Sequence, residues 1–190
     1  LRHYVACSTV SEHERDLVEK HVRPRCPVLV VPNGVDVEAC SHVVADPQPD
    51  TLIYSGALSY FANFDAVAYF IGEILPRIQA HRPNVRFRVT GSTKSVALDR
   101  LPQNSAVEFT GYLDDVRAAV ASSWVSVVPL RLGGGTRLKV LESMALGTPV
   151  VATGKGVEGI VLAPNADAFV ADTPDEFARR VLELLESAEL

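Results

Sequence analysis

The stretch RLGGGTRLKVLESMALGTPVVAT, residues 131–153, carries three consecutive glycines that run directly into a helix-like segment. Glycine loses more backbone freedom on folding than any other residue, so a run of three needs a reason. An apolar run at 124–128 precedes the glycines, and a second one at 149–152 follows the helix-like segment. This order predicts a strand, a glycine loop, a helix and another strand.

The same alternation of apolar runs and helix-length segments extends along the chain. Runs that are apolar throughout, separated by helical connections, predict a parallel sheet with helices on both faces, which is an α/β, Rossmann-like fold. The predicted strands are 28–31, 51–55, 85–90, 107–109, 124–128 and 149–152. The predicted helices are 11–22, 65–79, 113–122, 136–146 and 174–187. Parallel sheets bind ligands beyond the carboxyl ends of their strands. The loops expected there contain or border glycine: 56–63, 91–94, 111–115, 129–135 and 153–159.

The composition favours an ordinary soluble domain. The 190 residues are 47% hydrophobic and 22% charged, and the net charge of -5 argues against a general nucleic-acid binder. The sequence has no apolar run long enough for a transmembrane helix and no signal-peptide pattern at its start. Three cysteines with irregular spacing suggest neither disulfides nor a zinc site, so we expect a reduced, cytosolic protein.

The beginning of the chain suggests a further unit upstream. The sequence starts at Leu1 and its only methionine is Met144, so we expect that residues precede it. The proline-rich stretch 46–50 is typical of a connector. We therefore expect the first 45 or so residues to belong in part to a preceding unit.

Two cations stand where helices normally prefer acidic residues. Arg137 and Lys139 fall in the first turn of the predicted helix, next to its unpaired amides and partial positive charge. This placement is unfavourable unless an anion binds there, and a phosphate or diphosphate is the natural candidate. The alternatives are a flexible surface turn for the glycines, a solvated surface charge for Arg137, and an exposed pair of Lys139 with Glu142.

Glu142 is a second unusual feature of this helix. Leu138, Leu141 and Ala145 have the spacing of a buried helical stripe, and Glu142 lies on or beside it. A carboxylate near a buried face needs partners such as hydroxyl donors or a cation. The segment is not a phosphate loop of the G-x-x-x-x-G-K-[ST] type, because its lysine is inside the helix. No G-x-G-x-x-G follows the first predicted strand either.

Several segments, in order along the chain, resemble those of a known enzyme family. GGGTRLKVLESMALGTPVVAT at 133–153 resembles the donor-site signature of retaining glycosyltransferases of the GT-B fold, the bacterial group 1 or family-four type. VPNGVD at 31–36, YSGALSYFANFDAVAYF at 54–70 and VEFTGYLDDVRAAVASSWVSVVPL at 107–130 resemble its other segments. The resemblance implies that residues 1–36 are the end of an acceptor-binding domain and the interdomain hinge. Residues 37–190 would then form the C-terminal, nucleotide-sugar-binding domain.

The resemblance also implies roles for individual residues. In this family the glycine loop and helix start hold the donor diphosphate through backbone groups, here those of Gly133, Gly134, Gly135, Thr136 and Leu138. Gly56 and Ala57 would approach the diphosphate from the other side, unless Gly56 marks an ordinary turn. Glu142 would bind the ribose hydroxyls, and Gly111 and Tyr112 would flank the nucleotide.

Two departures from the family pattern concern charged residues. The first glutamate of the family's Glu-x7-Glu motif falls on Gly134, so the usual carboxylate contact to the donor sugar is absent. The usual arginine and lysine after the first glycine fall near Ala57 and Ala62. We interpret Arg137 and Lys139 as the catalytic groups that stabilise the leaving diphosphate from the opposite loop.

The reaction implied by the resemblance is transfer of a sugar from a nucleoside diphosphate to an acceptor hydroxyl with retention. We expect no metal ion or other cofactor, because no Asp-x-Asp motif or His/Asp cluster suggests a metal site. A carbohydrate or lipid-linked acceptor would be bound by the preceding domain, so we expect the isolated chain to be inactive. The resemblance further implies bacterial polysaccharide biosynthesis, no nucleic-acid partner, and a cytoplasmic location with peripheral association at the inner face of the membrane. The alternatives are a catalytically silent nucleotide-sugar-binding or regulatory module, a nucleotide-sugar epimerase of the same fold, and a flavodoxin-like domain.

Overall fold

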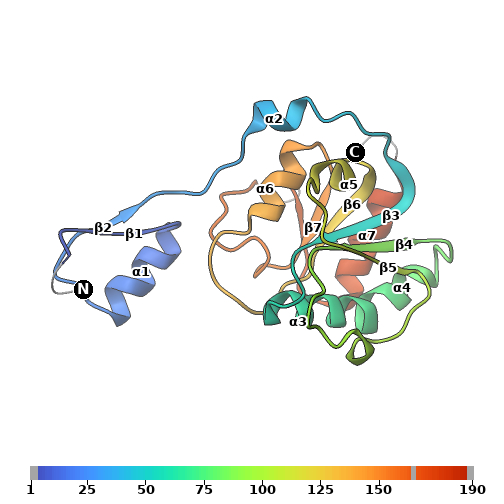
Figure 1. Ribbon diagram of the computed structural model, residues 1–190, viewed down its shortest axis with the longest axis horizontal. Coiled ribbons are helices and arrows are strands. Elements are labelled where there is room, and N and C mark those ends of the chain that lie inside the picture. The colour runs from blue at the N-terminus through green and yellow to red at the C-terminus, as the bar shows by residue number, and fades with distance from the viewer. Residues whose placement is uncertain (1–3, 164–165, 188–190) are drawn as a thin grey trace.

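The computed structural model describes residues 4–163 and 166–187 and consists of two parts joined by an extended segment (Figure 1). The smaller part is a two-stranded parallel sheet formed by β1 (Cys7–Thr9) and β2 (Val28–Val30), which are connected by helix α1 (Glu12–His21). The extended segment ends where helix α2 (Val37–Ser41) begins. A domain boundary is predicted at this point, and the assignment of the two parts to separate domains stays a prediction.

The larger part is built on a six-stranded sheet in which every neighbouring pair of strands is parallel, in the order β5-β4-β3-β6-β7-β8. The strands are β3 (Gln48–Ser55), β4 (Arg86–Thr90), β5 (Val107–Gly111), β6 (Ser123–Val128), β7 (Val150–Ala152) and β8 (Phe169–Val170). From β3 the chain moves outward to β5 and then crosses back to β6 on the other side of β3. This reversal opens a crevice at the carboxyl ends of β3 and β6, which is where open parallel sheets bind ligands.

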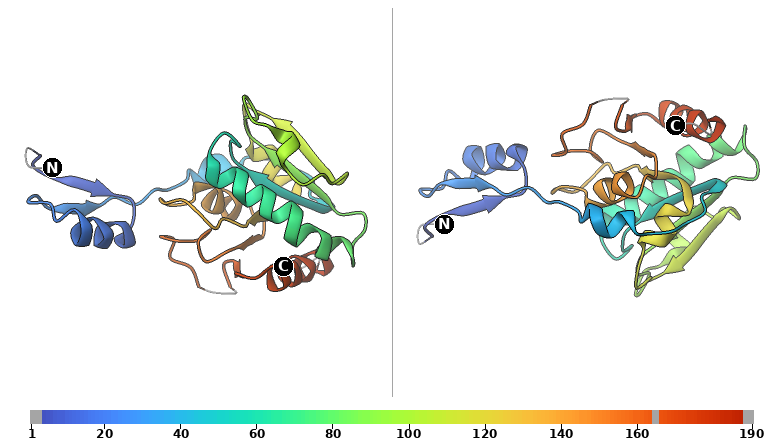
Figure 2. Two further views of the ribbon diagram at one scale, coloured as in Figure 1. Left: turned by 90° about the horizontal axis from the view of Figure 1, so that it is seen from below. Right: turned by 90° about the horizontal axis from the view of Figure 1, so that it is seen from above.

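Helices cover both faces of this sheet (Figure 2). One face carries a continuous helical run made of α3 (Phe61–Tyr69), the π-helical turn η1 (Phe70–Ile74) and α4 (Leu75–Gln79), with α7 (Pro174–Glu186) packed beside it. The other face carries α2, α5 (Arg117–Ala121) and α6 (Leu138–Ala145). A short 3-10 turn, η2 (Leu98–Arg100), lies between β4 and β5. The predicted Rossmann-like α/β fold is therefore confirmed.

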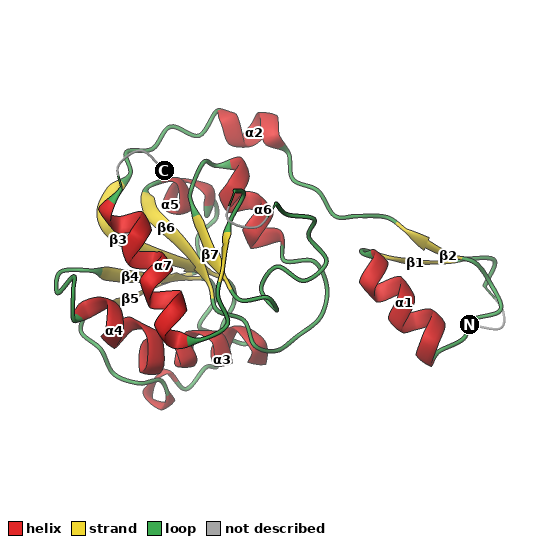
Figure 3. Ribbon diagram, turned by 180° about the vertical axis from the view of Figure 1, so that it is seen from behind, coloured by secondary structure: helices red, strands yellow, loops and turns green. Residues whose placement is uncertain are grey.

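The core holds the strand ends in position. Leu52, Ile53 and Tyr54 of β3 are fully buried because helices cover the strand on both sides. The ring centres of Phe70 and Phe87 lie 4.4 Å apart, and the ring centre of Phe177 lies 6.1 Å from that of Phe70. Phe177 belongs to α7, which packs against α4 (Figure 3). Burial of each such side chain contributes about 1.5–3 kcal/mol to folding. The loops that follow β3 and β4 therefore start from a rigid base.

Some predicted boundaries were wrong. Residues 46–50, predicted as a connector, include the start of β3. A strand tolerates these prolines because Pro47 precedes it and Pro49 lies where the pairing with β6 shifts register. The helix predicted to begin at residue 65 begins at Phe61. The helix predicted over 113–122 is limited to α5, because the carboxylate of Asp115 accepts a hydrogen bond from the Arg117 amide and delays the helix start.

Gly91 is a position where the fold depends on glycine. Its φ is +125°, and an added Cβ would lie 2.5 Å from the carbonyl carbon and oxygen of Gly56. We expect Gly91→Ala to lower the free energy of unfolding by about 3 kcal/mol, because it combines overpacking with a strained backbone. Gly147→Ala is the control, since its φ is +72° but no atom lies within 4 Å of the added Cβ; we expect it to cost about 1 kcal/mol. Urea denaturation followed by circular dichroism measures both values, and equal losses would contradict the steric argument.

Candidate functional site

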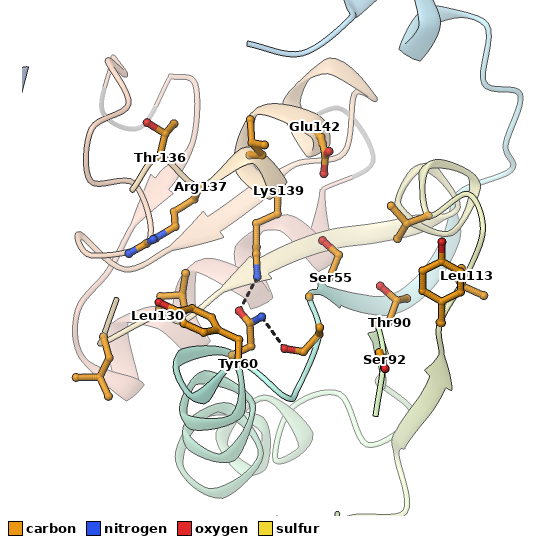
Figure 4. A pocket seen from close by; sticks show the side chains of 18 residues that line it. Ser55, Tyr60, Thr90, Ser92, Leu113, Leu130, Thr136, Arg137, Lys139 and Glu142 are labelled. Carbon is orange, nitrogen blue, oxygen red and sulfur yellow. Dashed lines mark hydrogen bonds between the residues drawn. The ribbon is translucent and has the colours of Figure 1, made fainter. Parts of the chain in front are cut away.

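A cleft of about 580 Å³ lies at the carboxyl ends of β3 and β4 and faces the N-terminal end of α6 (Figure 4). Its walls come from the ends of four strands and from two helices. They include residues 55–57 at the end of β3, 90–92 at the end of β4, 112–116 after β5, 130 and 132 after β6, residues 60 and 63 at the start of α3, and the first turns of α6. These segments meet because the strand order reverses between β3 and β6. The cleft is therefore a product of the sheet topology.

Gly56 leaves open the space in which two polar side chains meet. An added Cβ at this position would lie 2.8 Å from Lys139 Nζ and 2.8 Å from Asn63 Nδ2. The Gly56 amide donates to the Thr90 carbonyl oxygen over 2.9 Å, which ties the end of β3 to the end of β4. Glycine thus permits a close approach of these side chains, and the approach of Gly56 to a diphosphate stays a prediction.

Lys139 extends from the first turn of α6 across the cleft to β3 and α3. Its ammonium donates to Asn63 Oδ1 over 3.2 Å and lies 3.9 Å from the centre of the Tyr54 ring. The same Asn63 oxygen accepts the Tyr54 hydroxyl over 2.6 Å, and Asn63 Nδ2 donates to the Ala57 carbonyl over 2.8 Å. These contacts hold the ammonium in the cleft, so the alternative of an exposed pair with Glu142 is wrong.

Burial changes the protonation of this group. Withdrawal of the Lys139 ammonium from water, with a smaller effect of the nearby Arg137 charge, lowers its pKa to about 7, while Glu142 acts in the opposite direction. Burial also raises the pKa of the neighbouring Tyr54, which keeps its hydroxyl neutral and a hydrogen-bond donor. The charge of the lysine therefore responds to any anion that enters the cleft.

Arg137 is buried at the start of the same helix. The residue is 8% exposed, and its Nη1 donates to the carbonyl oxygen of Gly134 in the glycine loop. In the described part of the chain, Nε and Nη2 have no hydrogen-bond partner. A buried guanidinium with unpaired donors is costly unless an acceptor with negative charge binds to it. The alternative of a solvated surface charge is therefore wrong.

Glu142 lies one helical turn after Lys139 and lines the same cleft. The prediction that the stripe with Leu138 is buried was wrong. Leu138 is 41% exposed, and the buried residues of α6 are Val140 and Ser143. Neighbouring stripes of a short helix contain similar numbers of apolar residues, so their spacing did not reveal which one meets the core. The stripe that contains Leu138 and Glu142 faces the cleft instead, and this leaves the carboxylate accessible to a ligand.

The other predicted residues divide into two groups. Ala57, Tyr112, Thr136 and Leu138 line the cleft with Gly56, Arg137, Lys139 and Glu142. Gly111, Gly133, Gly134 and Gly135 do not line it and shape the adjoining loops. Gly133 and Gly135 adopt φ values of +98° and +82°, which favour glycine, whereas Gly134 has no such requirement and has open space beside it. The binding roles of all these residues stay predictions.

Sequence reasoning missed several residues of the cleft, among them Ser55, Asn63, Thr90 and Ser92. Ser55 and Thr90 each end a strand and precede a glycine, and this pattern is a signal that could have found them. Asn63 had no such signal, because its partner Lys139 lies 76 residues away along the chain.

Within residues 4–163 and 166–187, no group of three or more His, Cys, Asp or Glu side chains is arranged to hold a metal ion. None of the helices described has the length and apolarity needed to cross a bilayer.

Residues 49–187 match the family model described as glycosyl transferases group 1. The chain has no match among curated proteins. Among solved structures it is similar to HepE of Anabaena in complex with UDP-glucose, with 14% identity and a TM-score of 0.74 over 97% of this chain and 55% of that one. It is also similar to WaaG, a glycosyltransferase involved in lipopolysaccharide biosynthesis, with 17% identity and a TM-score of 0.67 over 95% of this chain and 54% of that one.

A third similar structure is a mutant of S. aureus TarM in complex with Fondaparinux, alpha-GlcNAc-glycerol and UDP. It is 14% identical, with a TM-score of 0.72, over 95% of this chain and 36% of that one. The chain therefore spans about half or less of the length of these three proteins. At such identities the likeness shows the fold.

Proposed function

The chain belongs to the group 1 glycosyl transferases and has the Rossmann-like fold of GT-B enzymes, and from this premise we propose that its cleft binds the nucleoside diphosphate of a sugar donor. The protein that contains it would transfer the sugar to an acceptor hydroxyl with retention of configuration. One observation supports the proposal above all. Two cations, Arg137 and Lys139, are withdrawn from water beside one cleft, and the first has two donor nitrogens without a partner in the described chain.

A diphosphate meets the requirements of this pair of cations. Its oxygens can accept hydrogen bonds from Nε and Nη2 of Arg137 and from Nζ of Lys139, and such charge-assisted bonds are the strong ones. The first amides of α6 carry a partial positive charge, and no side chain caps them, so they can also bind an anion. When the bond to the sugar breaks, negative charge grows on the diphosphate, and these preorganised groups stabilise it. In this proposal the two side chains take the role that a metal ion has in other enzymes, and no cofactor is required.

We propose that the remaining predicted residues contact the diphosphate, the ribose or the nucleoside. Glu142 lies one turn along α6 and has a carboxylate that only accepts hydrogen bonds when ionised, which suits the two ribose hydroxyls. We propose backbone contacts to the diphosphate from Gly56, Ala57, Thr136 and Leu138, which line the cleft, and from Gly133, Gly134 and Gly135 in the loop that adjoins it. Gly111 and Tyr112 would flank the nucleoside.

The partners proposed for the whole protein extend beyond this chain. We propose a carbohydrate or lipid-linked acceptor, bound by a preceding domain, and therefore no transferase activity for the 190-residue chain alone. Support comes from the solved relatives, since HepE was captured with UDP-glucose and TarM with UDP and alpha-GlcNAc-glycerol. A role in bacterial polysaccharide biosynthesis, a cytoplasmic location with peripheral membrane association, and the absence of a nucleic-acid partner are parts of the same proposal.

Calorimetric titration of the chain with UDP, GDP and FMN tests the proposal. We expect UDP or GDP to bind with a dissociation constant of about 1–100 µM, which is the range of many enzyme substrates. We expect no binding of FMN, because its single phosphate does not span both cations. Binding of FMN without UDP or GDP would favour a flavodoxin-like domain. Nucleotide binding combined with an inactive full-length protein would favour a catalytically silent module.

A further inference from the structure

Thr90 is a buried polar residue of the cleft to which the proposed function gives no role. It is the last residue of β4, it is 1% exposed, and it lines the cleft. Its hydroxyl oxygen has no hydrogen-bond partner among the residues that the structure describes. A buried hydroxyl without a partner lowers stability, so its presence calls for an explanation outside the free fold.

The register of the sheet brings this hydroxyl to the cleft. Thr90 pairs with Ser55 on β3 and with Gly111 on β5. The three positions lie across the carboxyl ends of adjacent parallel strands, and the pairing of β4 with β5 shifts register just before Thr90. Thr90 and Ser55, which are paired without a shift, share a face of the sheet. An added Cβ at Gly111 would meet no atom within 4 Å, so open space lies beside this position.

The cleft residues next to Thr90 on the β5 side are neutral, and both cations come from α6. The Lys139 ammonium crosses the cleft to the side of Asn63 and the Tyr54 ring. Ser92, two residues after Thr90, and Leu113, two residues after Gly111, line the cleft beside Thr90. Arg137 and Lys139 extend into the cleft from α6 (Figure 4). Ligand sites of this kind combine apolar walls with a few placed polar groups. The diphosphate therefore belongs beside the cations, and the uncharged part of the nucleotide belongs beside Thr90.

Resting on the proposed function, we propose that the Thr90 hydroxyl forms a hydrogen bond with the nucleobase and contributes to the choice of base. A threonine hydroxyl both donates and accepts, and the edge of a base carries both kinds of group. The ribose hydroxyls are assigned to Glu142, whose carboxylate lies on α6 across the cleft. Thr90 is thus a specificity-determining residue and takes no part in the chemical step.

Binding measurements on Thr90→Val and Thr90→Ser test this assignment. Valine keeps the shape of the side chain without the hydroxyl, and serine keeps the hydroxyl. For whichever of UDP and GDP the wild-type chain binds more tightly, we expect Thr90→Val to raise the dissociation constant about tenfold and Thr90→Ser to change it less than about threefold. Pyrophosphate contains no base, so its affinity should be the same in all three proteins.

A second measurement separates a ligand contact from a structural role. The Thr90 hydroxyl has no hydrogen-bond partner in the described part of the free protein, so burying it lowers stability. Thr90→Val removes this cost and should raise the Tm by about 2–5 °C while it weakens nucleotide binding. A hydroxyl needed for folding would give the opposite change in Tm. A lower Tm would therefore overturn the proposal.

The 2′-deoxy form of the nucleotide distinguishes the base from the ribose. If Thr90 contacts the base, Thr90→Val weakens the deoxy and the ribo forms by the same factor. A loss seen only with the ribo form would move the contact to the 2′-hydroxyl and overturn the assignment, as would equal affinities of wild type and Thr90→Val. If the wild-type chain binds neither UDP nor GDP, the proposed function itself fails, and this inference fails with it.

Discussion

Replacing Lys139 with methionine is expected to weaken the binding of UDP or GDP by about 100-fold. Methionine has a similar length and apolar stem, but it lacks the ammonium that lies between Asn63 and the Tyr54 ring. A hydrogen bond to a charged group contributes about 1.5–3 kcal/mol, and the variant also removes a positive charge from the proposed diphosphate site. Calorimetric titration of both proteins measures the ratio of their dissociation constants.

Lys155→Met is the matched control for this prediction. Lys155 Nζ lies 2.6 Å from Glu158, and the residue does not line the cleft. The control should bind nucleotides as the wild type does, and circular dichroism should show the same fold for both variants. If Lys139→Met bound UDP and GDP as tightly as the wild type, the ammonium would have no contact with the diphosphate, and the proposed role of Lys139 would be abandoned.

Strands that are buried on both faces could be predicted because burial leaves a continuous apolar run in the sequence. β3 is the clearest example, since Leu52, Ile53 and Tyr54 are all fully covered. β1 was missed because its three residues, Cys7, Ser8 and Thr9, form no apolar run, and β8 was missed because it contains only two residues. Short elements of this kind form through pairing with a neighbour, and a single sequence does not show which neighbour is present.

The cations of the site could be predicted, but their surroundings could not. Arg137 and Lys139 were found because positive charge at a helix start conflicts with the helix dipole, which is a local feature of the sequence. The contact of Lys139 with Asn63 joins α6 to α3, and the position of Thr90 depends on the register of β4 between its neighbours. Both are consequences of tertiary structure.

The affinity of the cleft for a diphosphate is expected to fall about tenfold for each pH unit above pH 7. Burial lowers the pKa of Lys139 to about 7 in the free protein. A bound diphosphate places negative charge beside the ammonium and raises this pKa in the complex. Between the two pKa values the protein must take up a proton in order to bind, so the affinity decreases as the pH rises.

Titrations between pH 7 and pH 9 measure this dependence, and buffers of different ionisation enthalpy reveal the uptake of about one proton. Lys139→Met is the control, because it has no group that titrates at this position and its weaker binding should be constant over the same range. An unchanged wild-type affinity at pH 7 and pH 9 would mean that Lys139 keeps its charge in the free protein.

Titration of Lys139 should change the stability of the free protein in the opposite direction: stability should rise with pH while nucleotide affinity falls. In the unfolded chain it keeps its proton up to its ordinary pKa of 10.5, whereas in the folded chain it releases the proton near pH 7. The unfolded state therefore binds more protons between these two values, and the free energy of unfolding rises with pH across this window. Nucleotide affinity should fall while stability rises. Partial unfolding at alkaline pH would lower both quantities together, so the two opposite slopes separate titration of Lys139 from a general loss of structure.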